Sequence, residues 1–127
     1  MGGQSVKLSE IQRVLGASKI CGGDCLDQEV LTACGADLMS DVLAFTKDGA
    51  LLLTGLNNPQ VVRTADVGGL RAIVFVRGKL PAPDVMEIAV NLDIPLFSTP
   101  YTLFEACGIL YKGGLKACPP VGKDRGS

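Results

Sequence analysis

The stretch LRAIVFVRGKLPAPDVMEIAVNLDIPLFSTP, residues 70–100, decides the fold class. It opens with five consecutive apolar residues, 72–76, which are rich in β-branched side chains and show no polar alternation. This pattern is typical of a strand buried on both faces of a parallel sheet. Residues 84–92 then carry apolar side chains at helical spacing, and a second short apolar run follows at residues 94–97. Strand, helix and strand of these lengths predict one right-handed crossover, and therefore an α/β fold.

The sequence on either side predicts further elements of the same kind. Apolar spacing indicates helices at residues 7–15, 42–45 and 59–67, a buried strand at 50–54 and a less regular strand at 29–36. Thr99-Pro100 resembles a cap followed by a first-turn proline, which predicts a last helix. The apolar stripe of that helix consists of Leu103, Phe104, Cys107, Leu110 and Tyr111. We therefore expect a small open sheet with at least three parallel strands, near Leu52, Val74 and Leu96, and helices on both faces. The domain should span residues 5–112, with residues 113–127 as a flexible tail.

Composition excludes several classes of protein. The 127 residues include 12 basic and 13 acidic side chains, so a net charge of −1 offers no basic field for nucleic acid or an anionic membrane. No apolar run approaches the length of a membrane span, and we expect a cytoplasmic protein. The chain has no histidine, which removes histidine bases, Ser-His-Asp triads and imidazole metal sites. We therefore expect neither catalysis nor a cofactor.

Three phrases of the sequence resemble the DRTGG domain family. They begin at residues 8, 36 and 93 and read LSEIQRVLG, ADLMSDVLAFTKDGALLLTGLNNPQVVRTADVGGLRAIVFVRGKLP and DIPLFSTPYTLFEACGILY. The resemblance implies a fold like the N-terminal domains of HPr kinase and the Mur ligases. It also implies a regulatory or dimerising role, because such domains accompany CBS domains in regulated pyrophosphatases and also occur beside iron hydrogenases. After the central strand, where many relatives carry a Gly-Gly pair, this chain has Arg77-Gly78-Lys79.

The first candidate site is the set of strand-to-helix junctions. Ligands of open parallel sheets bind beyond the carboxyl ends of the strands, where helix N-termini and glycine-containing turns favour anions. Arg77 and Lys79 would add positive charge. The alternative is that these residues only form caps and turns, as in any α/β protein. The predicted ligand-binding residues are Thr54, Gly55, Asn57, Asn58, Arg77, Gly78, Lys79, Ser98 and Thr99.

A second candidate site is the segment that contains Asp37, Ser40 and Asp41. By resemblance to the Mur ligase N-terminal domain, a Ser/Asp loop at this place contacts a uridine nucleotide. The alternative is that Ser40 caps a helix and that Asp41 favours its N-terminal dipole. That alternative explains both residue types without a ligand.

Cysteines form a third, weaker candidate site. Cys21, Cys25 and Cys34 could supply thiolates to a metal or an iron–sulfur cluster, but their spacing matches neither zinc ribbons nor ferredoxins. Cys34 and Cys107 fall on apolar faces, where cysteine behaves as a small hydrophobic residue.

Two functions follow as hypotheses. The first is a non-catalytic regulatory or dimerisation module that senses a nucleotide or another anionic small molecule. Homodimerisation is expected because apolar strands at the sheet edges would pair with a second copy. The second is an accessory subunit of an anaerobic, hydrogenase-type redox complex, with a protein partner and a thiolate-bound metal.

Overall fold

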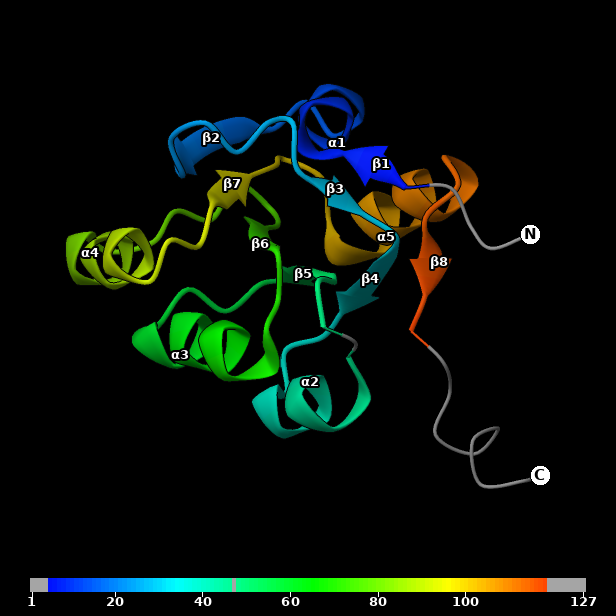
Figure 1. Cartoon of the computed structure of the whole chain (residues 1–127). Coiled ribbons are helices and arrows are strands. Elements are labelled where there is room, and N and C mark those ends of the chain that lie inside the picture. Colours follow the sequence, from blue (N-terminus) through cyan, green and yellow to red (C-terminus); the bar gives the residue numbers. More distant parts are fainter. Residues whose placement is uncertain (1–4, 47, 119–127) are drawn as a thin grey trace.

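The computed structural model describes residues 5–46 and 48–118 (Figure 1). Its elements, in chain order, are β1 (Val6–Lys7), α1 (Leu8–Val14), β2 (Ser18–Cys21), β3 (Glu29–Val30), β4 (Thr32–Gly35), α2 (Met39–Phe45), β5 (Leu51–Thr54), α3 (Pro59–Gly68), β6 (Ala72–Phe75), α4 (Pro83–Asn91), β7 (Leu96–Ser98), α5 (Leu103–Lys112) and β8 (Lys116–Ala117).

A six-stranded sheet in the order β2-β7-β6-β5-β4-β8 forms the centre of the molecule. The strands from β7 to β8 are mutually parallel, and β2 joins β7 antiparallel at one edge. The three strands predicted from the apolar runs are β5, β6 and β7, and they lie side by side as expected. A separate two-stranded sheet pairs β1 with β3. The mixed α/β class predicted from the sequence is confirmed.

Helices cover both faces of the sheet (Figure 1). Successive side chains of a strand point to opposite faces, so Leu51, Leu53 and Val74 pack with residues of α1 and α5. Leu52 and Phe75 point the other way and pack with residues of α2, α3 and α4. Both faces of β5 and β6 are buried, which explains why their sequences read as unbroken apolar runs.

Helix starts differ from the caps expected in the sequence. The cap of α5 is Thr102 rather than Thr99, because Thr102 and Glu105 form a reciprocal capping box. Ser40 does not cap α2: the N-cap is Leu38, and Ser40 is the second residue of the helix. Pro59 and Pro83 each lie in the first turn of a helix, where the missing N–H costs nothing.

Two segments near the edge of the sheet also differ from expectation. The strand expected at residues 29–36 is split into β3 and β4, which belong to different sheets. The segment expected to be a tail, residues 113–127, contains buried Leu115 and the strand β8, whose backbone pairs with β4. Residues 119–127 of that segment lie outside the described residues. The edge strands are therefore β2 and β8, and the apolar strands expected at the edges lie inside the sheet.

Candidate functional site

The carboxyl ends of β4, β5, β6 and β7 meet at one edge of the sheet, hereafter the carboxyl edge. The chain leaves β4, β5 and β6 through α2, α3 and α4 on one face, and it leaves β7 through α5 on the other. The change of face falls between β6 and β7. The strand order runs without reversal from β4 to β7 and reverses between β4 and β8, so the usual ligand crevice of an open α/β sheet does not fall between β6 and β7.

Main-chain hydrogen bonds close the gap between β6 and β7. The N–H groups of Arg77 and Gly78 donate to the carbonyls of Tyr101 (2.7 Å) and Thr99 (2.8 Å). The hydroxyl of Ser98 donates to the carbonyl of Lys79 over 2.7 Å. These amides therefore serve the protein itself, and the junction between β6 and β7 offers a ligand its side chains rather than its backbone.

At the neighbouring junction, after β5, a carboxylate from another segment is bound. Asp37 accepts hydrogen bonds at Oδ1 from the N–H of Gly55 and from the hydroxyl of Thr54, each at 2.8 Å. Asp37 was predicted as part of a separate candidate site, yet the fold brings it to the same edge as Gly55. The arrangement is that of an anion held by a backbone amide at a strand end, with the anion supplied by the chain itself.

Arg77 occupies an unusual backbone conformation at this edge. Its φ is 57° and that of Gly78 is 68°, and the N–H of Lys79 donates to the carbonyl of Val76 over 3.1 Å. Two successive positive φ angles within such a turn define type I′, which glycine or asparagine normally occupies. Arginine is strained there. A strained residue that persists is a reason to look for a functional role.

The side chain of Arg77 extends over Gly55. A Cβ atom placed on Gly55 would lie 3.2 Å from Nη2 of Arg77 and 3.6 Å from Oδ2 of Asp37, so glycine leaves room for both groups. Arg77 and Lys79 are exposed. Across residues 5–46 and 48–118, neither cation forms an ion pair. The carboxyl edge thus presents positive charge next to a bound carboxylate.

The other predicted residues have structural partners or lie aside. Asn57 donates from Nδ2 to the carbonyl of Leu80 (2.8 Å), and Asn58 is the N-cap residue of α3 without a side-chain cap bond. Thr99 is buried and donates from Oγ1 to the carbonyl of Leu15 over 2.6 Å. Ser40 and Asp41 are exposed in the first turn of α2.

The three cysteines predicted as a metal site do not come together. Cys21 ends β2 and Cys34 lies in β4, four strand positions away in the sheet. At about 4.8 Å between strands, this is a separation of roughly 19 Å. Nowhere in the part of the chain that the structure describes do three metal-binding side chains gather. Burial, complete for Cys25 and partial for Cys21 and Cys34, raises the pKa of the three thiols, which favours the protonated form over a ligating thiolate.

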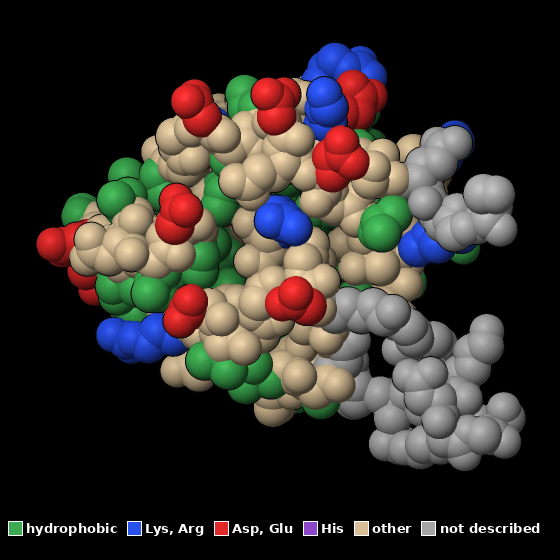
Figure 2. Space-filling model, in the orientation of Figure 1, with side chains coloured by type: hydrophobic (Ala, Val, Ile, Leu, Met, Phe, Trp, Pro, Cys, Tyr) green, Lys and Arg blue, Asp and Glu red, His purple; other side chains and the backbone are tan. Residues whose placement is uncertain are grey.

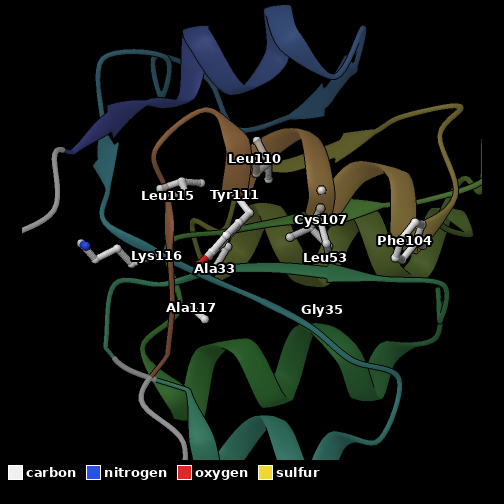
Figure 3. A pocket seen from close by; sticks show the side chains of 11 residues that line it. Ala33, Gly35, Leu53, Phe104, Cys107, Leu110, Tyr111, Leu115, Lys116 and Ala117 are labelled. Carbon is white, nitrogen blue, oxygen red and sulfur yellow. The ribbon is translucent and has the colours of Figure 1, made fainter.

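Sequence reasoning missed a groove of about 360 Å³ beside α5 (Figure 3). Its lining is almost entirely apolar and comes from β4, β5, α5 and the segment around β8. The lining residues are Ala33, Gly35, Leu53, Phe104, Cys107, Gly108, Leu110, Tyr111, Leu115, Lys116 and Ala117. The available signal was the spacing of Phe104, Gly108 and Tyr111, which places a glycine between two aromatic residues on one helix face.

Charge on the visible surface is dispersed. Figure 2 shows acidic side chains spread around one face and basic side chains scattered over it rather than gathered into a field. None of the helices within the described residues has the length and apolar character that crossing a bilayer requires. The cytoplasmic location expected from the sequence stays a prediction.

Comparison with known proteins identifies the family. No curated protein matches the sequence. The fold is similar to the CBS and DRTGG domains of the regulatory region of Clostridium perfringens pyrophosphatase, solved as a complex with the activator diadenosine tetraphosphate. The TM-score is 0.70 at 15% sequence identity, over 86% of this chain and 47% of that one, so the chain spans about half the length of that structure. Residues 10–112 match the sequence profile of the DRTGG domain, and the chain therefore belongs to the DRTGG domain family.

Proposed function

We propose that this chain is a non-catalytic regulatory module that binds a nucleotide or another phosphate-bearing anion at the carboxyl edge. One observation carries the proposal: the guanidinium of Arg77 lies against Gly55 at the strand ends, on a strained backbone, and within the described residues it forms no ion pair, although the carboxylate of Asp37 is nearby. Guanidinium groups match phosphate oxygens in geometry and charge. Lys79, two residues away in the same turn, adds a second cation.

Asp37 supports the proposal because it acts as a built-in anion. Its carboxylate takes the N–H of Gly55 and the hydroxyl of Thr54, which are the groups that a ligand oxygen would otherwise use. A phosphate bound to Arg77 would lie close to this carboxylate and be repelled by it. The module would then bind its ligand with moderate affinity, which suits a sensor.

The proposed role is non-catalytic because the hydroxyl groups at the same edge are already hydrogen-bonded within the protein. Thr54, Ser98 and Thr99 are buried, and each donates its hydroxyl hydrogen inside the protein. None of the three is presented to a substrate as a nucleophile.

Nucleotides are the first ligands to test, because the C. perfringens regulatory region was solved with diadenosine tetraphosphate. We would titrate ¹⁵N-labelled protein with diadenosine tetraphosphate, ATP and pyrophosphate and follow amide shifts. Amides of Gly55, Gly78 and Thr99 should move together. Arg77→Gln should weaken binding about tenfold or more, since a charged hydrogen bond contributes about 1.5–3 kcal/mol. The double variant Arg77→Gln/Lys79→Gln should lose the response.

The chain offers a matched control for Arg77. Arg71 stands just before β6 as Arg77 stands just after it, so Arg71→Gln removes the same charge at the opposite end of the same strand. Arg71→Gln should leave binding unchanged. Asp37→Asn keeps an acceptor oxygen and removes the competing charge, so it should tighten binding. Equal affinity of the Arg77→Gln and wild-type proteins, or shifts confined to other parts of the sheet, would refute the proposal.

The alternative of a redox accessory subunit gains no support from the described residues. The thiolate-bound metal considered as an addition to that role has no shared site here, because the strand order separates Cys21 from Cys34.

A further inference from the structure

We propose that the groove beside α5 is a self-association surface, in which the α5 helices of two copies pack antiparallel across Gly108. This goes beyond the proposed function, because it concerns another part of the molecule and a different partner. The proposal starts from the apolar side chains of α5. They occupy a wider arc of the helix surface than the arc that packs against the core. Ala106 and Leu110 are buried, whereas Phe104 and Tyr111 are 88% and 73% exposed.

One missing side chain, at Gly108, opens the groove, and another, at Gly35, lets α5 pack closely on the sheet beneath it. Gly108 faces open space, with no atom near the position of a Cβ. Gly35 lies opposite in β4, and a Cβ there would come within 2.5 Å of Sγ of Cys107. Phe104 and Tyr111 flank the gap along the helix, and Cys107 lies between them with its Sγ against Gly35 of β4 (Figure 3). A protruding aromatic ring and a hollow of about 360 Å³ therefore stand side by side on one surface.

A surface with a knob next to a hollow is self-complementary under a two-fold axis. In an isologous contact, residue i of one copy meets residue j of the other, and j meets i. With the axis near Gly108, Phe104 of each copy would enter the hollow of the other. Glycine at the crossing point lets two helix backbones approach closely, although it weakens an isolated helix.

The charges of α5 specify the antiparallel direction. Glu105 lies in its first turn and Lys112 in its last, and both are exposed. Residues 105, 108 and 112 share one helix face. Antiparallel crossing at Gly108 brings Glu105 of each copy opposite Lys112 of the other, twice per dimer, whereas parallel packing would oppose like charges. One oxygen of Glu105 accepts the capping bonds from Thr102, and the second oxygen is left for this contact.

The size of the contact surface determines how tightly the two copies are expected to bind. A helix of ten residues is about 15 Å long. A contact centred on one such helix and its groove falls at or below the lower end of stable protein interfaces. We therefore expect a weak dimer, with dissociation in the micromolar range or above.

The test is sedimentation of the full 127-residue chain from about 10 μM to about 1 mM. The wild-type protein should shift from monomer to dimer over this range. Phe104→Glu should weaken association at least about tenfold, because it places an unpaired charge in the other copy's groove. Gly108→Ala should also weaken association while raising the unfolding midpoint, so loss of the dimer cannot come from a damaged fold.

A control variant on another helix and a pair of charge-reversal variants on α5 complete the test. Val67→Glu changes another largely exposed apolar side chain, on α3 across the sheet from α5, and should leave the dimer intact. Glu105→Lys and Lys112→Glu should each weaken self-association, and mixing the two variants should restore it as a heterodimer. A wild-type protein that stays monomeric throughout, or a dimer that survives Phe104→Glu, overturns the proposal. A groove that binds an apolar dye or an added amphipathic peptide without self-association also overturns it.

Discussion

The carboxyl edge and the α5 groove differ in whether their side chains have partners inside the protein. At the carboxyl edge, Thr54, Ser98 and Thr99 each donate to an acceptor within the chain. Beside α5, Phe104 and Tyr111 remain largely exposed next to a hollow. The hydroxyl groups that the sequence suggested as ligand-binding groups are hydrogen-bonded inside the protein. The two aromatic side chains that the sequence placed on the apolar stripe of a helix are instead exposed on the surface. At the carboxyl edge, the side chains of Arg77 and Lys79 are exposed and form no ion pair among the described residues.

Two phenylalanines give the largest contrast between the regions. Phe75 ends β6 under the carboxyl edge and is fully buried, whereas Phe104 is 88% exposed. Phe75→Ala should lower the free energy of unfolding by about 3–5 kcal/mol, because it removes buried area and leaves a cavity. Phe104→Ala should change it by less than about 0.5 kcal/mol in dilute solution. Urea unfolding of both variants measures the difference, and similar losses would mean that Phe104 belongs to the core after all.

The apolar runs were the part of the fold that the sequence predicted best. β5, β6 and β7 are buried on both faces, so their composition alone identifies them without knowledge of any partner. Pro59 and Pro83 likewise act locally, since a proline fits the first turn of a helix whatever surrounds it.

The polar details could not be predicted because distant residues decide them. Thr99 has the sequence context of a helix cap, yet its hydroxyl bonds to Leu15, 84 residues away. Thr102, three positions later, finds Glu105 within its own turn and becomes the cap. Asp37 precedes a helix but bonds across to Thr54 and Gly55. Helical spacing on α5 correctly identified apolar residues, but it could not tell how wide an arc the sheet would cover.

At the carboxyl edge, a substitution of Thr99 should have an intermediate effect on the free energy of unfolding. Thr99→Val keeps the shape of the side chain and removes the hydroxyl, which leaves the carbonyl of Leu15 without this donor. Because the residue is buried, the free energy of unfolding should fall by about 1–3 kcal/mol. Thr102→Val is the comparison at an exposed site, where loss of the cap should cost about 1 kcal/mol. If Thr99→Val is harmless, water can replace the hydroxyl and the edge is more open than its hydrogen bonds indicate.

Arg77→Gly should have a small effect on stability although it removes a charged side chain, and this makes it the most informative about function. Arginine at a φ of 57° is strained by roughly 1–2 kcal/mol, and glycine relieves that strain. Glycine also adds about 0.5–1 kcal/mol of conformational entropy to the unfolded chain, which offsets much of the gain. Together the two terms should leave the free energy of unfolding unchanged or raise it by up to about 1.5 kcal/mol, which urea unfolding measures.

The neighbouring residue supplies the reverse exchange within the same turn. Gly78 has a φ of 68° and open space around its missing Cβ, so Gly78→Ala should destabilise the protein by backbone strain alone. If Arg77→Gly is neutral in stability and also loses anion binding, the strained arginine is kept for its charge. If Arg77→Gly instead costs more than about 2 kcal/mol, beyond what its backbone terms allow, the guanidinium over Gly55 holds the junction together. The carboxyl edge would then be a structural feature like the bonds that surround it, and the α5 groove would be the stronger candidate for an interaction surface among the described residues.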